Sequence, residues 1–181
     1  MTIRPVRRVV TGHDAKGRAI IQSDGPPTRV YDQLGQAGLV FHELWNTPET
    51  PARIDRAGGE PGEEKLALVP PRNGTRIRIL DVPPDDPAVE LEAVFEKVGA
   101  SENYLGAQSG RHASFHRTET VDYGIMLEGE LVLVMDVGET VVRAGDVVIQ
   151  RGTNHGWANR TDKPARIAFI LIDGKFEEEI A

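Results

Sequence analysis

Short apolar segments alternate with turn residues through the second half of the chain. From Ser114 onward, turns recur about every 8–12 residues, a spacing typical of all-β sandwiches and barrels. The turns occupy residues 128–130, 136–139, 144–146, 151–152 and 160–164, and a mostly apolar segment follows at 165–172. The pattern therefore predicts a β-barrel or sandwich built from short strands.

The first half of the chain has a less regular pattern. Apolar residues on both sides of a turn signal at 12–17 predict a hairpin within residues 6–31, and a further strand is expected at 39–45. Residues 46–75 are rich in proline and glycine. We expect them to form a long surface connection with a short strand at 66–69.

The segment 76–80 alternates polar and apolar residues, as a half-buried strand does. Arg76 and Arg78 share one face of this predicted strand because side chains alternate between faces. We expect that face to meet water. If it turned inward, the two arginines would form an anion site.

One amphipathic helix is predicted at 86–99. Asp86 can accept hydrogen bonds from the free amides at its start, and Pro87 suits the first helical position. Gly99 is a natural stop, and the apolar residues at helical spacing are Ala88, Leu91, Val94, Phe95 and Val98. This apolar stripe is expected to pack on the outside of a sheet.

Composition narrows the classes of protein that fit. The 181 residues suffice for one domain with an extension, divided into an N-terminal hairpin, arm and long loop at 1–75 and a barrel at 76–181. The 28 acidic and 21 basic residues give a formal net charge of −7, which disfavours nucleic acid as a partner. The chain has no cysteine, so thiolate ligands and a cysteine nucleophile are excluded. No signal-peptide pattern and no apolar run of roughly 20 residues is present, so we expect no membrane partner and a cytoplasmic location.

The candidate site lies in the segment 116–159, which carries two of the five histidines. Because side chains alternate along a strand, His116, Thr118 and Asp122 share one face, and a barrel would bring this face to His155. Two neutral imidazoles and one carboxylate, with coordination positions left open, suit Fe(II) and are acceptable to Mn, Ni, Co or Zn. These residues therefore indicate a site for one divalent transition metal.

Two spaced motifs lie in this segment. The first comprises His116, Thr118, Asp122 and Gly129, and the second comprises Gly145, Gln150, Gly152, His155 and Asn159. Through them the chain resembles the cupin superfamily, and in particular its small single-barrel, RmlC-like members. The resemblance covers about residues 112–172. It implies an all-β fold, the double-stranded β-helix or cupin jelly-roll barrel, with an N-terminal β extension and one short helix.

The resemblance also assigns roles, with departures from the family pattern. It implies His116, Asp122 and His155 as metal ligands, although Asp122 stands where cupins have glutamate. Thr118 stands where they have a second histidine, so its hydroxyl is expected to hydrogen-bond a bound water or the substrate. His112 is either a substitute ligand or a loop residue at the mouth of the pocket.

The remaining candidates are expected around a substrate pocket formed by His112, Thr118, Met126, Arg151 and Trp157. Trp157 either stacks on a planar substrate or fills a barrel end. Arg151 either binds a substrate carboxylate or faces solvent in its turn. Tyr104, or Asp122 if it is not a ligand, is the candidate for moving a proton.

Three functions stay open at the level of sequence. The first is a mononuclear-metal enzyme acting on a small hydroxy acid, oxo acid or enol-like substrate by oxygenation, decarboxylation, dehydration or isomerisation. The second is a metal-free cupin that binds or senses a small ligand without catalysis. The third is a protein that acts through self-association, since cupins often exchange N-terminal strands, and a homodimer is expected in any case.

Overall fold

The computed structural model describes residues 3–56, 58–61, 65–178 and 180, and most of its regular structure is β-strand. The strands are β1 (Arg8–His13), β2 (Ala19–Gly25), β3 (Arg29–Tyr31), β4 (Val40–Thr47), β5 (Thr75–Val82), β6 (Thr120–Glu128), β7 (Glu130–Met135), β8 (Glu139–Arg143), β9 (Val147–Arg151), β10 (His155–Ala158) and β11 (Ala165–Asp173). The helices are α1 (Leu91–Lys97) and two short 3₁₀ turns, η1 (Ser101–Asn103) and η2 (Gly106–Ser109). The predicted all-β class with one short α-helix is confirmed.

Two antiparallel sheets form the body of the protein. One has six strands in the order β3-β4-β5-β11-β6-β9, and the other has three in the order β10-β7-β8. Met126 and Ile167 from the first sheet share one buried cluster with Leu131, Leu133 and Val142 from the second. The two sheets therefore pack face to face around an apolar core, as in a jelly roll.

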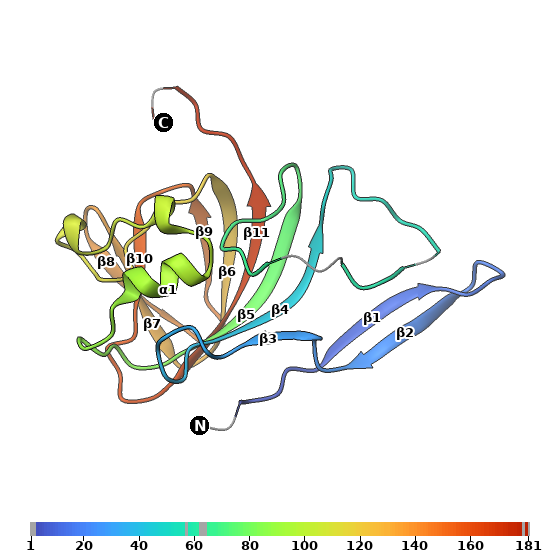
Figure 1. Cartoon of the computed structure of the whole chain (residues 1–181), viewed down its shortest axis with the longest axis horizontal. Helices are drawn as coiled ribbons and strands as arrows, with labels where there is room; N and C mark the ends of the chain where they lie inside the picture. Colours follow the sequence, from blue (N-terminus) through green and yellow to red (C-terminus); the bar gives the residue numbers. More distant parts are fainter. Residues whose placement is uncertain (1–2, 57, 62–64, 179, 181) are drawn as a thin grey trace.

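The N-terminal hairpin is formed by β1 and β2, as predicted. Asp14 holds its turn by accepting hydrogen bonds from the amides of Lys16 and Arg18. The hairpin extends away from the rest of the molecule (Figure 1), whereas β3 and β4 join the six-stranded sheet. That sheet therefore includes strands on both sides of residue 75, where the sequence suggested a boundary.

The face of β5 that carries Arg76 and Arg78 turns inward, contrary to the expectation that it meets water. Both arginines are buried, and Glu43 of β4 is buried beside them. β5 is paired on one side with β4 and on the other with β11, so it is a central strand with neighbours over its whole length. Alternation identifies the residues that share a face, but it does not say which face the core takes.

The helix is shorter than predicted and covers a different surface. It begins at Leu91, because Asp86 accepts a hydrogen bond from Ala88 N in a separate turn before it. Gly99 follows its end with a φ of 64°, as expected for a stop. Its buried residues, Val94 and Phe95, pack against Leu34, Leu39 and Phe41.

The connection between β4 and β5 does not contain the strand predicted at 66–69. Leu66 and Leu68 instead pack against the cluster around α1. Their apolar character therefore reflects burial beneath a loop rather than pairing in a sheet. In the described part of the chain, no helix is long and apolar enough to cross a membrane.

Candidate functional site

A cavity of about 360 Å³ lies between α1 and the inner faces of the strands. Its wall is mostly apolar, with contributions from Phe41, Leu80, Val94, Phe95, Trp157 and Phe169. Its polar lining includes Arg78, His116, Thr118, Asp122 and His155. An apolar cavity of this size with a few grouped polar side chains is typical of a small-molecule site.

His116 and His155 are neighbours in this cavity. Their backbones form an antiparallel bridge, with His116 N donating to His155 O at 2.8 Å and His155 N donating to His116 O at 2.9 Å. The two imidazole rings consequently lie side by side, with centroids 4.2 Å apart. The fold brings together the two histidines that the motifs singled out.

Both imidazoles are neutral and share one tautomer. Burial lowers the pKa of His116 to about 4, and burial followed by the neighbouring His116 lowers the pKa of His155 well below its usual value. His116 Nδ1 donates to Ser114 O at 2.7 Å, and His155 Nδ1 donates to Thr153 O at 2.9 Å. The proton therefore sits on Nδ1, and each Nε2 retains a lone pair.

Asp122 lines the same cavity from β6, on the face predicted for it. Burial raises its pKa to about 6, although a hydrogen bond from Thr120 and the charge of Arg78 act in the opposite direction. One carboxylate oxygen, Oδ1, is buried without a hydrogen-bond partner. Thr118 is also buried and lines the cavity, and its hydroxyl lies 2.8 Å from that of Thr120.

Two side chains in the cavity, His116 and His155, have donor atoms that suit a metal ion. Two neutral imidazoles with free Nε2 lone pairs are suitable ligands for a divalent transition metal. However, no three His, Asp or Glu side chains among the described residues are grouped so that they could hold a metal ion. Asp122 therefore lies in the same cavity without completing a three-ligand set with His116 and His155.

Four other predicted residues divide between the cavity and its surroundings. Trp157 lines the cavity, whereas Met126 packs in the core between the two sheets. Arg151 is exposed on the outer face of the edge strand β9, because Gln150 takes the inward position there. Tyr104 stacks on Phe95 with ring centroids 4.8 Å apart and is not one of the lining residues.

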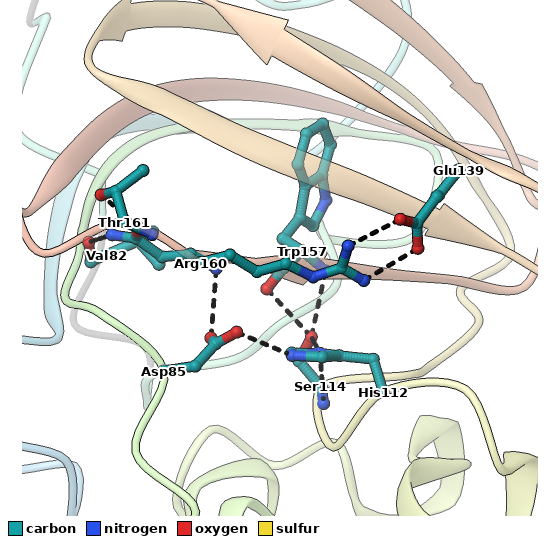
Figure 2. Close-up of polar contacts among 9 residues, drawn as sticks. Val82, Asp85, His112, Ser114, Glu139, Trp157, Arg160 and Thr161 are labelled. Carbon is teal, nitrogen blue, oxygen red and sulfur yellow. Dashed lines mark hydrogen bonds and ion pairs between the residues drawn. The ribbon is translucent and has the colours of Figure 1, made fainter.

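His112 lines the cavity but is engaged elsewhere (Figure 2). Its Nε2 donates to Asp85 Oδ2 at 3.2 Å, and its Nδ1 accepts from Ser114 N at 3.1 Å. Ser114 Oγ lies 2.8 Å from the same Nδ1 and accepts from Trp157 N at 3.0 Å. Both ring nitrogens of His112 therefore have hydrogen-bond partners in this arrangement, at the mouth of the site rather than beside the His116–His155 pair.

Sequence reasoning missed Asp85 and did not place Arg78 in the pocket. Asp85 Oδ1 also accepts from Asn159 N at 3.1 Å, which ties the end of β5 to the end of β10. Burial raises the pKa of Asp85, but hydrogen bonds from His112 and from Asn159 N outweigh it and lower the pKa. The only sequence signal was a pair of acidic residues, 85–86, directly after an apolar strand.

Comparison with known proteins finds a matching family model and several similar proteins. A family model described as "Cupin domain" matches residues 105–172. The "Cupin-domain-containing oxidoreductase virC" of Hypocrea virens is 30% identical over 183 residues, which cover 96% of this chain and 78% of that protein. The "Phomopsin biosynthesis cluster protein C'" of Diaporthe leptostromiformis is 29% identical over 179 residues, covering 96% and 81%. A "Cupin 2 conserved barrel domain protein" of Salinispora arenicola superposes with a TM-score of 0.42 at 17% identity, covering 75% of this chain and 76% of that one.

Proposed function

This chain is a member of the cupin family, and we propose that it is an oxidoreductase acting on a small organic molecule inside the barrel. The expected substrate is a hydroxy acid, an oxo acid or an enol-like compound. Relatives named cupin-domain-containing oxidoreductases support oxidation or oxygenation over decarboxylation, dehydration or isomerisation. The cavity supports a small molecule as the substrate because its volume suits one such ligand.

The observation that carries this proposal is the His116–His155 pair. Both rings are buried, both are neutral, and both have Nδ1 occupied by a backbone carbonyl. The hydrogen bonds fix the orientation of each ring, so the two Nε2 lone pairs are held in place before any ligand arrives. A pair whose only role was packing would not require two matched tautomers in a cavity.

We include one divalent transition metal in the proposal, with His116 and His155 as its protein ligands. Imidazole nitrogens suit Fe, Mn, Ni, Co and Zn, and a site with two protein ligands leaves positions for substrate. When bound, such a metal would act as a Lewis acid or as a site of redox chemistry.

The other residues of the cavity have roles that need no metal. The apolar wall binds the carbon skeleton of the substrate and excludes water, which strengthens polar interactions inside. Asp122 is the candidate for accepting or returning a proton, because its carboxylate has one free oxygen and its pKa of about 6 lies near neutrality. Thr118 contributes a hydroxyl to the lining of the same cavity.

The test is metal content together with substrate turnover. Protein prepared without a histidine tag is reconstituted anaerobically with Fe(II), and its metal is measured after gel filtration. We expect about one equivalent in the wild type, little in His116→Ala or His155→Ala, and an unchanged amount in the matched control His112→Ala. Turnover of a panel of hydroxy and oxo acids in air is followed by mass spectrometry and oxygen consumption.

Metal content that does not depend on His116 and His155 would remove the metal from the proposal. The alternative function is then a cupin that binds or senses a small ligand without catalysis. The observation that favours it is that Asp122 does not complete a three-ligand set. In that case, His116→Ala would change ligand affinity while leaving the metal content the same.

A further inference from the structure

Three residues lining the cavity carry buried polar atoms without a hydrogen-bond partner. Among the described residues they are Arg78 Nη1, Asp122 Oδ1 and Trp157 Nε1; Arg78 Nε also lacks a hydrogen bond but lies 3.0 Å from Glu43 Oε1. Buried polar atoms in folded proteins are nearly always paired, because an unpaired one loses its hydration without compensation. Two donors and one acceptor left unpaired around one cavity indicate a ligand with complementary groups.

Arg78 is the strongest of these observations. It is the largest fully buried side chain among the described residues, with 1% of its surface exposed. Its Nη2 donates to Ala67 O, and its Nε lies 3.0 Å from Glu43 Oε1. The guanidinium also lies over the ring of Phe41, 5.3 Å from its centroid. The group is therefore held on three sides, and Nη1 is its unpaired donor.

The charges around Arg78 favour an anion. Glu43 is shared, since its Oε2 also lies 3.0 Å from Arg76 Nη1. Burial lowers the pKa of Arg78 to about 10, so it stays protonated at neutral pH. Asp122 acts on Arg78 through its charge, but no hydrogen bond satisfies either Nη1 or Oδ1.

We propose that Arg78 binds the carboxylate of a hydroxy acid with an apolar body, whose hydroxyl donates to Asp122 Oδ1. Trp157 Nε1 supplies a second donor to an oxygen of the same molecule. The remaining wall of the cavity, with Leu80, Val94 and Phe95, accommodates the apolar body. A carboxylate matches the planar guanidinium of Arg78, which presents its N–H donors in a fixed fork.

This inference rests on the proposed function for the statement that the ligand is a substrate, but the binding site stands on its own residues. Among the proposed substrates it favours a hydroxy acid over an oxo acid. The reason is that an unpaired carboxylate oxygen requires a donor, which a hydroxyl provides and a keto group does not.

The experiment compares four related compounds by calorimetry in a buffer free of carboxylates. They are mandelate, phenylacetate without the hydroxyl, mandelamide without the charge, and benzoylformate with a keto group. We expect mandelate to bind about tenfold or more tightly than each of the others, as expected for one lost hydrogen bond to a charged group. 2-Hydroxyoctanoate, with an aliphatic body, is the second acid tested.

Variants test which residue contacts the carboxylate of mandelate and which contacts its hydroxyl. Arg78→Lys is expected to weaken mandelate about tenfold while leaving mandelamide unchanged, because it keeps a charge but loses the planar fork. Asp122→Leu is expected to remove the preference for mandelate over phenylacetate. Arg166→Lys is the matched control, since Arg166 is a largely buried arginine that pairs with Asp81 and does not line the cavity.

A spectroscopic readout covers the case in which a variant fails to fold. The chain has two tryptophans, so the indole N–H region of a proton–nitrogen spectrum contains two signals. Mandelate is expected to shift the Trp157 signal and to leave Trp45 unchanged, with Trp157→Phe assigning the pair. Equal binding of mandelate and mandelamide, or no binding of either hydroxy acid at millimolar concentration, would overturn the inference. Binding that follows this pattern in a protein whose metal content does not depend on His116 and His155 would remove the metal from the proposed function and leave this inference intact.

Discussion

Arg166 holds Asp81 through two parallel hydrogen bonds, Nε to Oδ1 at 2.6 Å and Nη2 to Oδ2 at 2.7 Å. His42 Nε2 lies 3.1 Å from the same Oδ2 on the neighbouring strand. Burial raises the pKa of Asp81, but the hydrogen bonds from His42 and Arg166 outweigh burial and bring the pKa down to about 2. This pair therefore links the stability of the six-stranded sheet to pH.

The folded-state pKa of Asp81 lies below its unfolded value of about 3.9. Its contribution to stability is therefore complete above pH ~4 and is lost as pH falls through ~2. Asp81→Asn is expected to lower the free energy of unfolding at pH 7 by about 2 kcal/mol and to flatten its decline between these pH values. Urea unfolding at several pH values measures both effects. Asp162→Asn, at an exposed turn, is the control, and an Asp81→Asn curve parallel to the wild type would contradict the assignment.

Glu43 is expected to be essential for folding stability, because it is the carboxylate that lies between two buried arginines. Glu43→Gln removes this charge and is expected to cost about 3–5 kcal/mol. Chemical denaturation measures the difference. Glu130→Gln, which breaks the exposed pair with Arg143, should cost about 1 kcal/mol or less. Similar losses in both variants would mean that the buried group does not depend on Glu43.

Ser114 links the loop after η2 to β10, so its hydroxyl is expected to protect the Trp157 amide. Ser114→Ala removes the acceptor of the Trp157 N–H bond and a partner of His112 Nδ1. We expect a loss of about 1–2 kcal/mol in unfolding free energy and faster hydrogen exchange at Trp157 N. Ser101→Ala, at an exposed position, is the control. Unchanged exchange at Trp157 would show that this bond does not limit opening.

The N-terminal hairpin is the proposed surface for a homodimer by strand exchange. β1 and β2 pair with no other described strand, and the hairpin exposes Val9, Ile20 and Ile21, the last with 67% of its surface accessible. Ile21→Glu is expected to convert a dimer to a monomer in sedimentation velocity at micromolar concentration. Val137→Glu, at the exposed turn between β7 and β8, should leave the dimer intact. A monomeric wild type would rule the dimer out.

The spacing of turns and motifs was sufficient to predict the strands β6 and β10, which carry Asp122 and His155, because alternation and turn chemistry are local properties. It was not sufficient for Arg78, since the choice of inward face depends on which strands pair on either side of β5. Asp85 was missed for a related reason. Its partner His112 lies 27 residues further along the chain, and no local pattern joins the two.

The predicted helix shows a second limit of prediction from local sequence. Asp86 and Pro87 form a favourable helix start by local rules, and the structure uses Asp86 in a turn instead. The apolar positions 91, 94, 95 and 98 were correctly identified as buried or lining residues, but their partner is the cavity and the inner face of β4. The local pattern identified the apolar residues of this segment, whereas tertiary packing determined the length and orientation of the helix.

The group of Arg76, Arg78 and Glu43 has a consequence for how this protein can be divided. Its members come from β4 and β5, upstream of the stretch that carries the family signature at 105–172. A fragment limited to that signature would keep both histidines and Asp122, but it would lack Arg76, Arg78 and Glu43. A fragment that is to contain both the histidine pair and the proposed anion-binding residue Arg78 therefore has to include β4 and β5.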